Sequence, residues 1–177
     1  HVLDNPLPEV TKSTSTPNIT KGTDIQWNVS VTNDELETNP NRRSTDFTLV
    51  DILPYVGDER IDPNTNREGS QFGGELMYKT VTADFSHAAN VLAEFQNGEG
   101  AFYYTTGEAV RTASESQILG TAGSGNITWT KADGEVDGTS VAFQVPMDAV
   151  AIRLDALLLW EGSLSLDMTA NVKNLSE

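Results

Sequence analysis

The sequence predicts an all-β, immunoglobulin-like β-sandwich of about nine to ten strands. Apolar and polar residues alternate with a period of two through much of the chain, and β-branched and aromatic residues are spread along it. Turn dipeptides such as Asn97-Gly98 and Asp137-Gly138 separate the alternating runs. No segment shows a convincing amphipathic helical pattern, and a helical turn is expected only within 86–94. Short strands joined by turns are typical of a sandwich.

Four runs predict strands most clearly. Residues 25–32 are apolar at odd positions and polar at even positions, as in a sheet with one face in water. Residues 47–53 form a second run, which stops at Pro54. Residues 149–160 are apolar on both faces over part of their length, which favours a central strand, and residues 164–173 alternate again.

The weaker strand candidates are 9–16, 75–85, 91–96, 101–106, 125–131 and 139–145. The alternation within separate strands also predicts which side chains share the core. These are Trp27, Val29, Val31, Leu49, Ile152, Leu154, Leu166 and Met168.

Length, charge and cysteine content limit the class of protein. The 177 residues fit a single domain over 1–177, excised from a larger surface protein, since no signal-peptide pattern opens the chain. The net charge of −15 argues against nucleic acid or an anionic membrane as partner. The longest apolar run, 154–160, is too short to cross a bilayer. The absence of cysteine excludes disulfides and thiolate chemistry.

Several motifs occur in an order that resembles the repeat domains of Gram-positive cell-wall-anchored surface proteins. In that family a lysine-bearing first strand precedes a G-D-x-x-x-(W/Y) strand and then a (V/I)-x-D-x-L-P strand. The segments here that resemble the family are 10–13, 22–33, 47–54, 55–58, 67–72, 151–154 and 162–166, with Thr23 between Gly22 and Asp24 and with Leu49 at the (V/I) position. The resemblance covers both ends of the chain, whereas the middle third is generic.

The resemblance implies a structural stalk or adhesin module, located outside the cell and attached to the wall through its parent protein. Its partners would be neighbouring domains of that protein and a host or glycan ligand of unknown identity. Many domains of the family form an intramolecular Lys–Asn isopeptide bond beside a catalytic carboxylate, and related domains without that bond are common.

Strand parity identifies residues that could form such a bond. Asp51 shares a face with Leu49 and Leu53, Lys12 shares one with Val10, and Asn174 follows the apolar parity of the last strand. An uncharged lysine amine could attack the asparagine amide while a protonated acid shuttles protons. The sequence thus predicts a Lys12–Asn174 cross-link with Asp51 as its autocatalytic acid.

Other assignments for these residue types remain open. Lys12 could be exposed, Asp51 could cap a strand end, and Asn174 could belong to a frayed terminus. Asn171 is a second acceptor candidate, although it alternates outward. Poorer donor candidates are Lys21 and Lys79.

An acidic loop over 58–68 is a weak calcium candidate. Its oxygen-bearing side chains belong to Asp58, Asp62, Asn64 and Asn66, but the glycine and the final glutamate of an EF-hand are missing. We therefore expect a plain acidic loop with no cofactor, and calcium is the weaker alternative.

An alternative function is a carbohydrate- or other ligand-binding module appended to a secreted enzyme. Trp129, Tyr103 and Tyr104 are the aromatic residues most expected to be exposed for stacking on sugars, whereas Trp27 is expected in the core. An enzymatic role is not expected, because no nucleophile–base pair is visible in the sequence.

Overall fold

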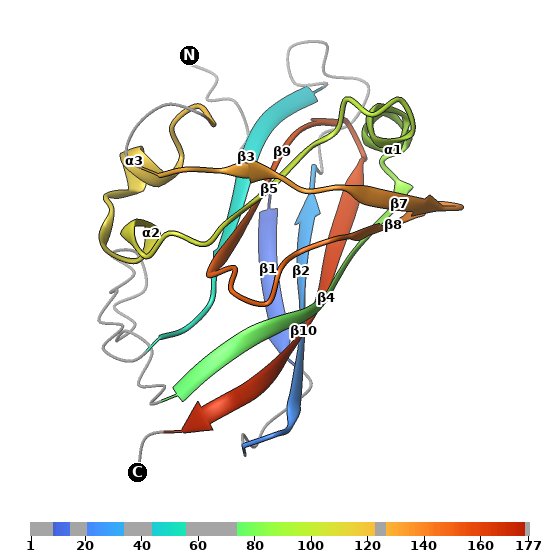
Figure 1. Ribbon diagram of the computed structural model, residues 1–177. Coiled ribbons are helices and arrows are strands. Elements are labelled where there is room, and N and C mark those ends of the chain that lie inside the picture. The colour runs from blue at the N-terminus through green and yellow to red at the C-terminus, as the bar shows by residue number, and fades with distance from the viewer. Residues whose placement is uncertain (1–8, 15–20, 34–43, 56–73, 123–126, 176–177) are drawn as a thin grey trace.

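The computed structural model describes residues 9–14, 21–33, 44–55, 74–122 and 127–175. Within them, ten strands form two antiparallel sheets, which confirms the predicted sandwich (Figure 1). The six-stranded sheet has the order β1 (Glu9–Thr14), β2 (Asp24–Thr32), β10 (Ser163–Leu175), β4 (Gly74–His87), β8 (Ser140–Phe143) and β7 (Gly134–Asp137). The four-stranded sheet has the order β3 (Ser44–Ile52), β9 (Ala151–Leu159), β5 (Ala101–Thr105) and β6 (Thr130–Lys131).

The first and last strands lie on either side of β2. Both pair antiparallel with β2, so β1 and β10 run parallel to each other. Glu9 and Ser163 both pair with Thr32 at one end of the sheet, and β10 runs from there to Leu175, away from that end (Figure 1). The chain therefore enters β1 at one end of the sheet and leaves β10 at the other.

The main core lies between the two sheets. Seven of the eight predicted core residues are buried in one apolar cluster, and the eighth, Leu49, packs against it. β9 lies between β3 and β5 and is buried on both faces over much of its length, as its sequence predicts. In contrast, all six residues of β1 are exposed, and none of them belongs to an apolar cluster.

The predicted strand over 91–96 is wrong, because these residues belong to helix α1 (Ala89–Gln96). Val91 is buried, and Leu92 and Phe95 pack against the main core from the same helical face. The Phe95 ring stacks on Phe85, with 5.3 Å between the ring centroids. A short apolar run does not distinguish a strand from a helix by periodicity alone, and tertiary packing selects the helix here.

A second apolar cluster, absent from the sequence-based prediction, lies on the other face of β9. Helices α2 (Ala109–Thr112) and α3 (Glu115–Ile118) contribute to it. Its buried members are Val110, Ile118, Ile127, Trp129 and Ala151. Only 130–131 of the predicted strand 125–131 is a strand, and residues 123–126 are outside the described part of the chain.

Candidate functional site

A buried carboxylate on β3 joins the two sheets at one edge of the sandwich. Asp51 is 7% exposed, and its Oδ1 lies 2.5 Å from Lys12 Nζ on β1. Its Oδ2 accepts a hydrogen bond of 2.9 Å from the indole Nε1 of Trp27 on β2. A buried carboxylate is costly unless it is paired and hydrogen-bonded, and both conditions are met here.

The local sequence explains why these side chains meet. Strand alternation places Asp51 on the same inward face as Leu49, as the parity predicts. Lys12 pairs with the buried Val29, so its side chain starts toward the same interior, and its Nζ lies 5.7 Å from the Trp27 ring centroid. About half of the Lys12 side chain, 52%, remains exposed to water.

Tyr78 on β4 completes this group. Its hydroxyl donates to the backbone carbonyl of Asp51 at 3.3 Å, and its ring packs 6.2 Å from that of Trp27. Burial raises the pKa of the Tyr78 hydroxyl well above its usual value, and the negative charge of Asp51 adds to the effect. We refer to Lys12, Trp27, Asp51 and Tyr78 as the Asp51 cluster.

The register does not bring Asn174 to this cluster. Lys12 pairs with Val29, which pairs with Leu166 on β10, whereas Asn174 lies eight residues farther along β10 and pairs with Glu75. Eight residues of extended strand span about 26 Å, far beyond the reach of a lysine side chain. The predicted Lys12–Asn174 bond does not fit this arrangement. The β10 side chains that face inward at this level belong to Leu166 and Met168, which carry no amide.

A different lysine, carboxylate and asparagine meet on the outer face of the six-stranded sheet. Asp24 on β2 lies 2.6 Å from Lys79 Nζ on β4 and accepts a hydrogen bond of 3.0 Å from Asn171 Nδ2 on β10. The sequence ranks Lys79 as a poorer donor and places Asn171 outward, and the structure confirms that outward position. The same residue types that amide chemistry needs are therefore assembled here.

The environment of Asp24 nevertheless opposes that chemistry. The hydrogen bond from Asn171, followed by the contact with Lys79, lowers the pKa of the Asp24 carboxyl below its usual value. Asp24 is therefore ionised and cannot act as a proton donor near neutral pH. The Lys79 side chain is 58% exposed, so water solvates its ammonium group. This group acts as a polar ladder across three strands rather than as a reaction centre.

The calcium candidates Asp58, Asp62, Asn64 and Asn66 lie outside the described residues, so their prediction stays untested. Among the residues that the structure describes, no group of three or more histidine, aspartate or glutamate side chains could hold a metal ion.

Trp129, Tyr103 and Tyr104, the aromatic residues considered for stacking on sugars, do not form an exposed row. Trp129 is buried in the second apolar cluster, with 9% exposed, which contradicts its predicted exposure. Tyr103 and Tyr104 are half-buried against the two clusters. Trp27 is buried, as expected. The prediction for Trp129 failed because the segment that covers it, with α2 and α3, gives no strong periodic signal.

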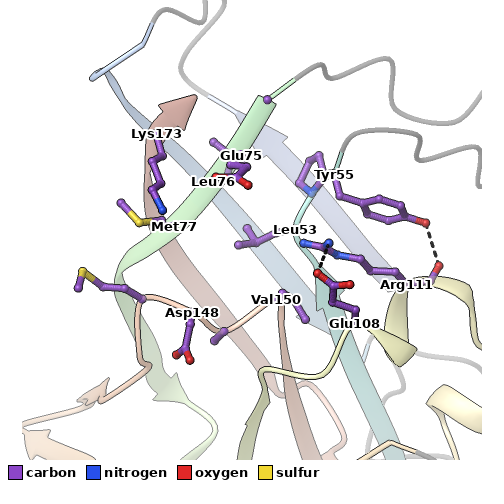
Figure 2. A pocket seen from close by; sticks show the side chains of 14 residues that line it. Leu53, Tyr55, Glu75, Leu76, Met77, Glu108, Arg111, Asp148, Val150 and Lys173 are labelled. Carbon is purple, nitrogen blue, oxygen red and sulfur yellow. Dashed lines mark hydrogen bonds and ion pairs between the residues drawn. The ribbon is translucent and has the colours of Figure 1, made fainter. Parts of the chain in front are cut away.

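A pocket of 430 Å³ lies at the end of the sandwich where β3 ends and β4 begins (Figure 2). Its apolar lining includes Leu53, Leu76 and Val150, and charged side chains from β4, α2, β10 and the loop before β9 surround it. The Arg111 guanidinium lies 4.9 Å from the ring centroid of Tyr55, whose hydroxyl donates to the Arg111 carbonyl at 2.9 Å.

Sequence reasoning missed this pocket, because its lining comes from five segments that are far apart in the chain. The charged side chains around it carry both signs, Glu75, Glu108 and Asp148 against Arg111 and Lys173.

The chain matches no protein-family model, no curated protein and no solved structure. None of the helices in the described ranges is both long and apolar enough to span a membrane.

Proposed function

We propose that this chain is a force-bearing structural module, a stalk or adhesin domain, of a bacterial cell-surface protein. The module would lie outside the cell, joined to neighbouring domains of a wall-attached parent chain. The observation that carries the proposal is the parallel course of β1 and β10 on either side of β2.

This arrangement loads the sheet in shear when the two ends of the chain are pulled apart. The force acts along β1 and β10, whereas the interstrand hydrogen bonds lie perpendicular to the strands. All the bonds of a ladder then resist together instead of breaking one after another. β2 carries the force from six paired residues of β1 to nine of β10.

Sequence features support the same role. The order of motifs resembles the repeat domains of Gram-positive surface proteins, and the acidic surface with net charge −15 suits a solvated extracellular module. The absence of cysteine leaves rigidity to the sheets and to contacts such as Lys12–Asp51, which ties edge strand β1 to the opposite sheet.

Single-molecule pulling tests the proposal directly, because a chain without cysteine accepts attachment points at chosen residues. A Glu9→Cys and Lys173→Cys chain is pulled along β1 and β10, with handles at opposite ends. A second chain carries Glu9→Cys and Ser163→Cys. It keeps the attachment point at residue 9, but both of its attachment points pair with Thr32 at the same end of the sheet.

We expect the first geometry to unfold at a markedly higher force than the second at the same pulling speed, because shear loads the bonds together and peeling breaks them in turn. Forced unfolding is governed by the unfolding rate, which a destabilising substitution could also raise. The two chains are therefore compared only if their free energies of unfolding are equal. Equal unfolding forces in the two geometries would contradict the proposal.

The pocket in Figure 2 favours a second candidate, a ligand-binding module appended to a secreted enzyme. Its volume of 430 Å³ falls within the range of small-molecule sites. Against a glycan ligand, Trp27 and Trp129 are buried, so neither ring is open to stack on a sugar. A glycan array tests this candidate: binding by the wild type that is lost in Met147→Arg, at the exposed side of the pocket, would support it. No binding by the wild type would reject a glycan ligand.

A further inference from the structure

Strand β1 differs from the other long strands of the sandwich because none of its side chains is buried. Its six residues are all exposed, and even Val10, on the inward face, is 52% exposed. It pairs with β2 over its whole length and is one of the two edge strands of the six-stranded sheet. β1 therefore contributes backbone pairing but no side chain to the apolar clusters.

The position that β1 occupies combines the backbone edge of β2 with a charged group from the opposite sheet. The backbone of β2 offers six paired positions, and the Asp51 carboxylate from the opposite sheet meets the amine of Lys12. This arrangement selects an extended segment that carries a lysine opposite Val29. The β1 sequence of a second copy carries that lysine by identity, so it matches the position in both pairing and charge.

We propose that β1 exchanges between copies of this chain, so that β1 of one copy pairs with β2 of another and its Lys12 contacts the second copy's Asp51 carboxylate. The released strand leaves the cores intact, because they contain none of its residues. This inference goes beyond the proposed function and does not rest on it. Exchange breaks the ladder by fraying, one bond after another, so it is compatible with high resistance to shear.

A second copy fits this position better than an unrelated strand, because backbone pairing alone leaves Asp51 without its cation. A segment without a basic residue at the Lys12 position would leave this buried carboxylate with the Trp27 indole and no cation. The inward-pointing lysine also protects the edge from unspecific pairing, a common role of charged residues on edge strands.

Disulfide trapping in the full chain tests the exchange. Thr11 and Ser30 are cross-strand partners on the outward face, so a Thr11→Cys chain mixed with a Ser30→Cys chain can form a covalent heterodimer after exchange. The control mixture combines Thr11→Cys with Glu135→Cys, an exposed residue of β7 at the opposite edge of the same sheet. A single chain with both Thr11→Cys and Ser30→Cys checks that the pair can close.

We expect the double variant to close within one chain, and the Thr11/Ser30 mixture to form heterodimer at least tenfold faster than the control mixture. Heterodimer formation at the control rate would overturn the proposal, as would a double variant that fails to close.

A second comparison tests the contact with Asp51. Adding Lys12→Gln to both chains should raise the trapping rate several-fold, because the strand opens more often without its ion pair. Lys79→Gln removes an exposed ion pair to Asp24 of similar length and should leave the rate unchanged. An equal effect of the two substitutions would show general loosening and would contradict the role of Lys12.

Discussion

At the scale of single residues, the Asp51 side chain connects the two sheets. Its two carboxylate oxygens accept from Lys12 on β1 and from Trp27 on β2, while its own strand belongs to the opposite sheet. The two contacts differ in environment, because the indole bond is buried and the lysine side chain is half-exposed.

Substitutions at Asp51 and Lys12 should therefore differ in cost. Asp51→Ala leaves the buried Trp27 N–H without an acceptor and should lower the free energy of unfolding by about 3 kcal/mol. Lys12→Met should cost only about 1 kcal/mol, because solvent screens the half-exposed ammonium group. Urea unfolding followed by tryptophan fluorescence measures both. Asp51→Asn keeps an acceptor for the indole and serves as the control, and a cost equal to that of Asp51→Ala would contradict the role of this hydrogen bond.

Tyr78 should make the protein sensitive to alkali. Its pKa is raised in the folded state by burial and by the Asp51 charge, so the unfolded chain loses the phenolic proton first. The stabilisation is complete below the ordinary tyrosine pKa of about 10 and is lost as the pH rises above it, by about 1.4 kcal/mol per pH unit. Urea unfolding of the wild type and of Tyr78→Phe at pH 9 and pH 11 isolates this effect. An unchanged difference in stability between the two chains at the two pH values would contradict it.

Intact mass tests for the cross-link that the sequence predicts and the register does not support. We expect the mass of the unmodified chain, because Asn174 lies far along β10 from the level of Lys12 and because Asp24 is ionised. Loss of one ammonia would contradict this expectation. Lys79→Arg would then identify the donor, since it abolishes the loss only if the Lys79 amine attacks the Asn171 amide beside Asp24.

Strand parity correctly predicted that Asp51 faces the core, because the period of two is local to one strand. It could not predict that Asn174 would be remote, because the distance between two strands depends on their register and on the register shifts between β10 and β4, which alternation does not encode. The same limit applies to Lys79, Asp24 and Asn171, which meet only through the pairing of three strands.

At the scale of elements, Arg153 attaches the segment with α2 and α3 to the sheet. Its side chain is 2% exposed and donates to the carbonyls of Ile118 and Gly120 at 3.1 and 2.6 Å. Its Nε contacts Asp155 at 2.9 Å, and the guanidinium lies 5.7 Å from the Trp129 ring centroid. One planar side chain thereby holds the end of α3 over the four-stranded sheet.

Replacing Arg153 should loosen this segment before the rest of the protein. Arg153→Met removes the donors for two carbonyls and one carboxylate and should cost about 3 kcal/mol locally. Hydrogen exchange should accelerate in 109–118 while the amides of β2 and β10 stay protected. Arg153→Lys keeps the charge but lacks the planar fork, so it should give an intermediate effect. Uniform acceleration across all elements would indicate global destabilisation instead.

The elements that sequence predicts best are those with one wet and one buried face. β2 and β10 alternate clearly and are strands as predicted, whereas residues 91–96 of α1 were predicted as a strand, although a helical turn was expected within 86–94, and α2 and α3 were not predicted at all. α2 and α3 are helices of four residues each, too short for a periodic pattern, and their stability depends on the second apolar cluster. Ser114 does carry a recognisable signal, because it forms a capping box with Gln117.

At the scale of the whole molecule, the net charge of −15 opposes compaction, because the acidic groups repel one another more strongly in the folded chain than in the expanded one. Exposed pairs such as Lys79–Asp24 contribute little against this repulsion. Salt screens interactions between exposed charges over about 10 Å at 0.1 M and about 3 Å at 1 M. Salt stabilises the fold if the repulsion among acidic groups exceeds the attraction within exposed ion pairs, and it destabilises the fold otherwise. The excess of acidic residues makes the repulsion the larger of the two.

Added salt should accordingly raise the melting temperature. Between 10 mM and 500 mM NaCl we expect a stabilisation of about 1 kcal/mol, which corresponds to about 2–4 °C for a domain of this size. CaCl₂ at matched ionic strength distinguishes screening from a specific site, because a ligand that binds only the folded state stabilises it further by mass action. Equal shifts with the two salts would fit a plain acidic loop at 58–68. A further rise with micromolar to millimolar calcium, abolished in Asp62→Asn, would locate a calcium site in that loop. A fall in melting temperature with NaCl would instead show that attractive pairs outweigh the repulsion and would refute the charge argument.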